Sequence, residues 1–279
     1  MGMLTERLVT DDGGLWLDFR AYAARLLAAG SVPWLDADAA TGWMRKAQAL
    51  LKSNVVSLPV AEVAEAWLRA NAGLVAAMGA KRRTDYPLKT LLADEALRAH
   101  LQSLATFLRS SFGSQPLVLA LPSPRHWVAV AHAQARPGDA VEVDADAVDD
   151  AAVYIADFLR SFADCGLDGV LLEEGREPAP SLAEALPLYQ PVFNVASHYR
   201  WDTGLLLPAN VSAEVGEGLD FLVASAPVTG VTPGLRVPES FWEDGVVAPC
   251  PERGFRFAEI PVGAHPESVL DRLAGLRGT

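Results

Sequence analysis

The stretch YIADFLRSFADCGLDGVLLEE, residues 154–174, joins two patterns of apolar residues and decides the fold class. Its first part has helical spacing, because Ile155, Phe158 and Phe162 recur on one face. Its second part is an unbroken apolar run, Gly169–Leu172, which is typical of a strand buried on both faces of a parallel sheet. A helix followed directly by such a strand indicates an α/β fold with right-handed crossovers.

Apolar runs of the same kind recur along the chain and extend this alternation. They are bounded by Gly or Pro and predict strands at Leu117–Leu121, Gly169–Leu172, Val192–Val195, Leu219–Ala224 and Phe255–Ile260. Weaker runs that would complete a barrel lie at Leu15–Phe19, Val55–Leu58 and Val246–Ala248. This succession fits a doubly wound sheet or a (β/α)8 barrel, and eight candidate strands favour the barrel.

The expected fold is therefore α/β, a single (β/α)8 TIM-type barrel domain over residues 1–279, short or irregular in places. The first part, residues 1–115, is expected to be mainly helical, and residues 116–279 to carry regular β/α repeats. Helical spacing is found in residues 62–75, 87–112, 146–164 and 265–276. Segments rich in Pro or Gly, expected to be loops, are residues 176–180 and 228–238.

The composition excludes several functional classes. The chain has 279 residues, of which 51% are hydrophobic, so it can bury a core and is not a disordered chain. With 23 basic and 35 acidic residues the formal charge is −12, and nucleic acid is not expected as a partner. The two cysteines, Cys165 and Cys250, cannot form a disulfide framework, which fits a reducing compartment.

The sequence also lacks a segment with the length and apolarity of a signal peptide or a membrane span. We therefore expect an acidic, cytoplasmic protein that binds a small-molecule substrate and contacts no membrane. For its assembly, the general preference of soluble proteins for homodimers is the basis for expecting a homodimer.

Polar residues follow the predicted strands, where parallel α/β folds place their ligand sites. The candidate catalytic residues, carboxylates and imidazoles that could transfer protons, are Glu173, Glu174, His126 and His198. The candidate substrate-binding residues are Arg125, Trp127, Asn194, Tyr199, Arg200, Ser225 and His265. In a barrel these segments would converge on one mouth. Each residue also has a structural interpretation, as a helix start, a solvated loop side chain, a core residue or an ion-pair partner.

Motifs for the common cofactors are absent from the sequence. It contains no Cys-x-x-Cys, His-x-Cys or His-Glu-x-x-His spacing, so no metal is expected and zinc is disfavoured. It contains no Gly-x-Gly-x-x-Gly, no Gly-rich phosphate loop and no Gly-x-Ser-x-Gly. These absences disfavour a nucleotide cofactor and a serine hydrolase, and we expect no cofactor.

Residues 154–174 resemble a segment of one barrel superfamily. The order helix, Ala, Gly, apolar strand and acidic end is similar to that of cobalamin-independent methionine synthase and uroporphyrinogen decarboxylase. Where the synthase strand ends in Asp-Glu-Pro, this chain has Glu173, Glu174 and Gly175. Residues 191–199 are similar to the synthase strand that carries a His-x-Cys zinc pair, but Asn194 and His198 come without the cysteine.

The resemblance implies a barrel with its site at the carboxyl ends of the strands, and either methyl transfer or decarboxylation. The leading hypothesis is a zinc-free, methyltransferase- or lyase-like enzyme that acts on a small carboxylated substrate. Glu173 or Glu174 would bind an amino or cationic group. Arg125 and Arg200 would hold carboxylates, and His126 or His198 would move a proton.

Two alternatives without chemistry remain open. One is a degenerate barrel that binds a small molecule or a protein partner. The other is an interaction protein that uses exposed Trp residues such as Trp201 and Trp242. An acid–base pair within reach of one pocket would favour the enzyme.

Overall fold

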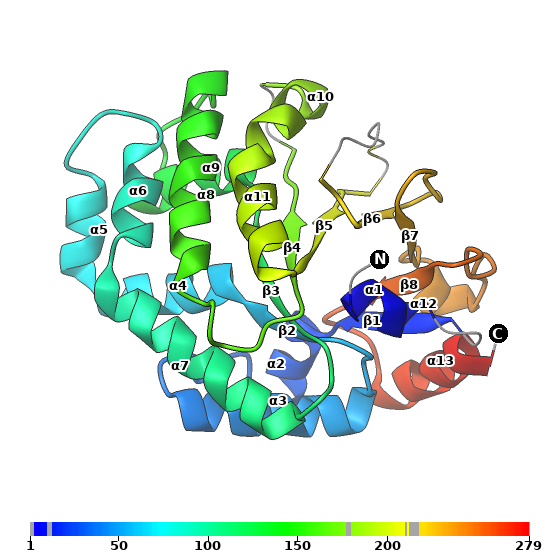
Figure 1. The fold of residues 1–279 in the computed structure, drawn as a ribbon. Coiled ribbons are helices and arrows are strands. Elements are labelled where there is room, and N and C mark those ends of the chain that lie inside the picture. The colour runs from blue at the N-terminus through cyan, green and yellow to red at the C-terminus, as the bar shows by residue number, and fades with distance from the viewer. Residues whose placement is uncertain (1–2, 10–12, 177–179, 210, 212–217, 279) are drawn as a thin grey trace.

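A computed structural model describes residues 3–9, 13–176, 180–209, 211 and 218–278. Its eight strands are all parallel and hydrogen-bond in the order β1-β8-β7-β6-β5-β4-β3-β2. The sheet curls, and helices alternate with most of its strands (Figure 1). The predicted (β/α)8 TIM-type fold is therefore confirmed.

The strands are short, as expected for a barrel. They are β1 Gly14–Asp18, β2 Val56–Pro59, β3 Leu117–Pro122, β4 Gly169–Glu173, β5 Asp202–Leu206, β6 Phe221–Ala224, β7 Thr232–Arg236 and β8 Phe255–Glu259. The helices before β4 are α1 Met3–Leu8, α2 Arg20–Ala28, α3 Ala37–Leu51, α4 Val60–Ala70, α5 Ala72–Met78, α6 Tyr86–Leu92, α7 Glu95–Phe112, α8 Pro124–Ala135 and α9 Ala145–Arg160. Those after it are α10 Leu182–Ala185, the 3₁₀ turn η1 Leu186–Tyr189, α11 Gln190–Tyr199, α12 Phe241–Asp244 and α13 Pro266–Gly278.

Local sequence explains where several helices begin. The side chains of Asp94, Ser123 and Asp144 accept backbone N–H bonds from the first turns of α7, α8 and α9. The cap at Asp94 also divides the predicted helix over 87–112 into α6 and α7. In the same way, the pattern over 62–75 divides at Asn71 into α4 and α5.

Three predictions about strands are wrong. Val192–Val195 belongs to α11, where Val192, Phe193 and Val195 are buried and Asn194 is exposed, so the run is one face of a helix. Val246–Ala248 has no regular structure. The predicted loop over 228–238 contains β7, whose Pro233 and Gly234 are unfavourable in a strand interior.

The other strand that the sequence pattern missed is β5. It begins with the polar residues Asp202 and Thr203 instead of an apolar run. Asp202 is buried because it accepts hydrogen bonds from the backbone N–H and the hydroxyl of Thr5, at 2.8 and 2.9 Å. Helix α1 thereby lies against the amino end of β5.

Among the described residues no helix separates β5, β6 and β7, so the regular alternation expected for 116–279 does not hold there. Most of the segment expected as a loop over 176–180 lies outside the described residues.

The barrel interior is a separate apolar cluster enclosed by the strands. Its aromatic rings are those of Trp16, Phe221, Phe255 and Phe257, with centroids 5.8 to 6.1 Å from that of Trp16. Gly204 makes room for them, because a Cβ on it would lie 1.9 Å from Cε2 of Phe221. The interior is therefore a packed core, and the mouth above it is the place for a site.

Side chains close the barrel between β1 and β2. The carboxamide oxygen of Asn54 accepts the N–H of Leu15 at 2.7 Å, and the hydroxyl of Ser53 accepts the N–H of Leu17 at 3.0 Å. The indole N–H of Trp16 donates to the hydroxyl of Ser57 at 3.0 Å. These bonds replace the regular ladder along this seam.

We expect Ser53→Ala to lower the free energy of unfolding by about 1–3 kcal/mol, because it leaves buried backbone N–H groups without an acceptor. Ser53 is only 3% exposed, and its hydroxyl also accepts the N–H of Val55. Urea denaturation would measure the loss. The matched control is Ser110→Ala on the exposed face of α7, which should change stability by less than about 0.5 kcal/mol. Equal stabilities of the two variants would contradict a role for Ser53 in closure.

Candidate active site

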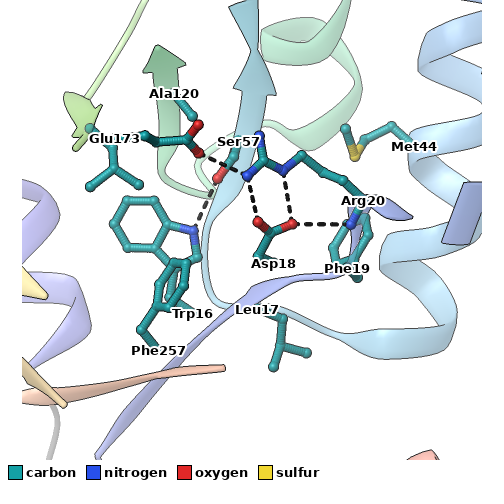
Figure 2. A pocket seen from close by; sticks show the side chains of 11 residues that line it. Trp16, Leu17, Asp18, Phe19, Arg20, Met44, Ser57, Ala120, Glu173 and Phe257 are labelled. Carbon is teal, nitrogen blue, oxygen red and sulfur yellow. Dashed lines mark hydrogen bonds and ion pairs between the residues drawn. The ribbon is translucent and has the colours of Figure 1, made fainter. Parts of the chain in front are cut away.

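Four charged side chains from three βα units meet at the mouth of the barrel. Asp18 ends β1 and Arg20 begins α2, Glu62 lies in the first turn of α4, and Glu173 ends β4. Nε of Arg20 donates to Asp18 at 2.8 Å, and Nη2 donates to Glu173 at 2.8 Å. Glu62 lies 3.5 Å from Nη1 of Arg20. Figure 2 shows the guanidinium between the carboxylates of Asp18 and Glu173.

The charge of Arg20 affects the pKa values of the neighbouring carboxyl groups to different extents. Burial alone raises the pKa of Asp18, but the charge and hydrogen bonds of Arg20 outweigh it, so the pKa falls below its ordinary value. Burial opposes the charge of Arg20, yet Asp18 and Glu173 raise the pKa of the guanidinium well above normal. Arg20 is therefore a fixed cation, and Asp18 a fixed anion.

Glu62 is different, because it titrates near neutrality. Partial loss of hydration is the largest cause that raises its pKa from 4.5 to about 7, although the Glu62 side chain is still 38% exposed. Arg20 lowers the pKa, while the negative charges of Asp18 and Glu173 raise it. A carboxyl group with a pKa near the working pH can both accept and donate a proton, which suits general acid–base chemistry.

Three of these residues, Asp18, Arg20 and Glu173, line a small cavity of ≈ 20 Å³, which has room for about one water molecule. Its lining contains both charged residues of the mouth and apolar residues of the barrel interior. Figure 2 labels the lining residues Trp16, Asp18, Arg20, Met44, Ser57, Glu173 and Phe257, and Leu171 also belongs to the lining.

A larger hollow of ≈ 610 Å³ lies over the carboxyl ends of β6, β7 and β8. Its polar lining residues are Ser225, Arg236, Glu239 and Glu259, and most of the others are apolar. Arg236 donates from Nη1 to the carbonyl of Leu207 at 2.6 Å and from Nη2 to Glu259 at 2.9 Å. The two halves of the mouth adjoin, because Glu259 is paired in register with Asp18.

A methyltransferase from Methanosarcina mazei has a similar structure. The TM-score is 0.61 with 16% sequence identity, and the match covers 99% of this chain and 98% of that chain. This likeness extends over the whole barrel and shows the fold. No protein-family model matches the chain, and no curated protein sequence does either.

The structure separates the two adjacent glutamates that the sequence singles out. Glu173 points into the mouth, whereas Glu174 is buried on the other face of the strand. Oε1 of Glu174 accepts bonds from Ser123 at 2.9 Å and from two nitrogens of Arg125 at 3.1 and 3.2 Å. Oε2 accepts the Tyr189 hydroxyl at 2.8 Å. Arg125 and Glu174 thus form a buried pair between β4 and α8 and are not brought to the mouth.

Arg125 also holds the chain that follows β4. Its Nη2 donates to the carbonyl of Gly175 at 3.0 Å and its Nη1 to that of Pro180 at 2.8 Å. Burial, followed by the charge of Glu174, raises the pKa of Tyr189 well above its ordinary value, so the phenol stays a donor. The network is saturated with bonds and fixes the backbone that carries Glu173.

The remaining candidates occupy several places. Trp127 is 1% exposed and packs against Phe158, and the backbone N–H of His126 donates to Ser123 at 3.2 Å. Ser225 lines the larger hollow, and His265 is exposed just before α13.

The candidates on and after α11 are Asn194, His198, Tyr199 and Arg200. They precede β5 instead of following a strand, so His198, Tyr199 and Arg200 lie toward the amino end of β5, opposite the mouth. Asn194, His198 and Tyr199 line an outer hollow between α9 and α11. Trp201, expected to be exposed, is 5% exposed.

Sequence reasoning missed most of the mouth. Asp18 follows the apolar run Leu15–Leu17 just as Glu173 follows Gly169–Leu172, so this signal was available. Glu62 lies within a helical pattern, and Arg236 lies in a segment predicted to be a loop.

Among the described residues no group of three or more His, Cys, Asp or Glu is placed to hold a metal ion. None of the described helices is long and apolar enough to cross a membrane.

Glu62 should make stability depend on pH. Because its pKa is raised on folding, the native protein keeps a proton that the unfolded chain releases between about pH 4.5 and 7, so its contribution to stability falls as the pH rises. Glu62→Gln should therefore gain melting temperature relative to the parent at pH 8 but not at pH 4. Thermal denaturation across this range measures the effect. Glu65→Gln, exposed on the same helix, is the control and should show no such trend. If the difference in melting temperature between Glu62→Gln and the parent does not change with pH, the raised pKa of Glu62 is contradicted.

Glu174→Ala should lower the free energy of unfolding by about 3–5 kcal/mol, because it leaves the Arg125 guanidinium buried without its counter-charge. The side chains of Glu174 and Arg125 are 0% and 6% exposed. The neighbouring Glu173→Ala is the matched control, with a smaller loss expected because Glu173 is 21% exposed and Arg20 keeps Asp18. Chemical denaturation of both variants measures the two losses. A larger loss for Glu173→Ala than for Glu174→Ala would contradict the structural role of Glu174.

Proposed function

We propose that this protein is a barrel enzyme that acts on a small carboxylated substrate at the carboxyl ends of its strands. The observation that carries the proposal is the meeting of Asp18, Arg20, Glu62 and Glu173 at the mouth, with Glu62 having a pKa of about 7. A fixed ion pair beside a titrating carboxyl group is the arrangement that proton transfer needs. Glu62 is the proposed proton-transfer group.

Arg236 is the proposed site for the carboxylate of the substrate. It lines the ≈ 610 Å³ hollow, its side chain is 18% exposed, and its hydrogen bonds to Leu207 and Glu259 hold the guanidinium in place. Its ion-pair partner Glu259 has a side chain that is 62% exposed, so a substrate carboxylate competes with a weak surface pair. The guanidinium can then bind the carboxylate through charge-assisted hydrogen bonds.

Glu173 is proposed to bind an amino or other cationic group of the substrate. It lies beside Arg20, whose charge is also compensated by Asp18, so the mouth has more carboxylates than guanidiniums. A substrate with both a carboxylate and an amino group would span the two halves of the mouth.

The proposed reaction class is methyl transfer or decarboxylation. The resemblance of residues 154–174 to the methionine synthase and uroporphyrinogen decarboxylase superfamily supports both, and the structural similarity to a methyltransferase supports the first. In decarboxylation the bond to the carboxyl carbon breaks, CO₂ leaves, and Glu62 gives its proton to the carbanion. In methyl transfer, a methylated co-substrate such as a methylated folate would be the donor: its bond to the methyl carbon breaks as the acceptor group of the substrate forms one. Ionised Glu62 takes the proton of the acceptor group and passes it to the departing demethylated donor.

Zinc-dependent transfer is not part of the proposal, because the cysteines do not fit it. Sγ of Cys165 faces the carbonyl of Gln102 in α7 at 4.0 Å. Cys250 lies beside Gly13, before β1. Neither thiol lines the hollows of the mouth, so we propose a reaction that uses no thiolate-bound zinc and no resident cofactor.

A second candidate is a barrel that binds a small molecule without chemistry. The observation in its favour is that the ions of the mouth satisfy one another, since Arg20 contacts three carboxylates and Arg236 contacts Glu259. Such a protein would bind ligand equally well without a titrating Glu62.

The test begins with a thermal-shift screen of small amino and carboxylic acids, folates and porphyrinogens, followed by product detection by NMR for the ligands that stabilise the protein. We expect Glu62→Gln to lower kcat by about 10²–10⁴-fold. Glu65→Gln is the control. Arg236→Gln should raise KM by about 10- to 100-fold, with Arg45→Gln on the exposed face of α3 as its control. Ligand binding without turnover, unchanged in Glu62→Gln, would instead support the non-catalytic barrel.

A further inference from the structure

Arg256 lies buried in β8, outside the mouth. Its neighbours Phe255 and Phe257 belong to the interior cluster, so the alternation of a strand directs Arg256 outward. It is 2% exposed, and its register partners are Leu15 of β1 and Leu235 of β7. A cation among apolar strand residues requires acceptors to offset the loss of hydration.

The described residues provide this guanidinium with one acceptor. Nη1 donates to the carbonyl of Leu276 in α13 at 3.1 Å. Nε and Nη2 are buried and have no hydrogen-bond partner among the described residues, and no ion pair of Arg256 is found there. The ordinary pattern in proteins is that buried polar atoms are bonded, so these two nitrogens require an explanation.

The two unbonded nitrogens lie on the same edge of the guanidinium. The N–H groups of Nε and Nη2 are parallel in this planar group and match the two oxygens of a carboxylate. The bond from Nη1 to Leu276 fixes the orientation of the group without using this edge. The geometry therefore leaves a bidentate donor pair without a partner on a buried side chain.

A half-buried thiol lies within reach of this charge. Burial raises the pKa of Cys250, while the positive charge of Arg256 lowers it. Cys250 in turn packs against the chain before β1, because a Cβ on Gly13 would lie 3.0 Å from its Sγ. Cys250 can therefore report on any anion that offsets the charge of Arg256.

We propose that Arg256 binds a small oxyanion of the carboxylate class through its Nε–Nη2 edge, at a site on the outer face of β8 that is separate from the mouth. The ligand supplies two acceptor oxygens and the negative charge that the buried guanidinium otherwise lacks. Binding stabilises the folded state, because an unfolded chain offers no such site.

The first experiment compares melting temperatures in sodium formate and in sodium chloride at equal ionic strength. We expect formate at 100 mM to raise the melting temperature by about 2–4 °C more than chloride does. Arg256→Met should abolish the difference and should still fold, because replacing a buried charge by an apolar side chain of similar length is often neutral or stabilising. Arg253→Met, which removes an exposed guanidinium three residues away, is the control and should respond as the parent does.

Arg256→Lys is the second variant, since it keeps the charge and removes the planar pair of donors. It should lose the preference for formate over chloride. A second readout is the rate at which Cys250 reacts with an aromatic disulfide, measured in a Cys165→Ala background. Formate should slow this rate, because a bound anion offsets the charge that favours the thiolate.

Two results would overturn the proposal. An equal response of the parent and Arg256→Met to formate would place the effect elsewhere on the protein. Equal effects of formate and chloride on the parent, in both melting temperature and thiol reactivity, would show that water alone solvates the edge.

Discussion

The seam between β1 and β2 is the constraint on which the candidate site depends. These strands end the hydrogen-bonded order of the sheet, and the side chains of Ser53, Asn54 and Ser57 bond them across the gap. Asp18 lies on one side of the seam and Glu62 follows the strand on the other. Only a closed seam brings Glu62 to within 3.5 Å of Arg20. The hydrogen bonds that close the barrel therefore also hold the two sides of the mouth together.

Adjacent glutamates show how one strand serves both fold and site. Successive side chains of a strand point to opposite faces, so Glu173 enters the mouth and Glu174 enters the layer between sheet and helices. In that layer Arg125, Ser123 and Tyr189 hold Glu174 rigidly. A buried pair that is fully bonded fixes the backbone beside it, and the position of Glu173 follows from that rigidity. One residue type therefore has two roles: Glu174 supports the fold on one face, and Glu173 is partly exposed in the mouth on the other.

The fold was predictable wherever burial on both faces leaves an unbroken apolar run. Leu117–Leu121 and Gly169–Leu172 lie in β3 and β4 for this reason. The rule fails for β5. Its polar residue Asp202 can be buried because it accepts a hydrogen bond from Thr5, which is 197 residues away in the sequence. The rule fails for 192–195 in the opposite sense, because four residues of a buried helical face resemble a buried strand. Both errors concern contacts that short-range patterns do not contain.

The sequence by itself determined the fold class and the position of Glu173 at the carboxyl end of a buried strand, where it is a candidate site residue. Spacing and composition carry this information because secondary structure and burial are largely local. Tertiary structure alone decided that Arg20 lies between Asp18 and Glu173, that Glu62 titrates near neutrality, and that Glu174 and Arg125 support the fold. The charge state and the role of a polar side chain depend on how deeply it is buried and on which charges face it. Both are set by residues that are distant in sequence and adjacent only after the barrel has closed.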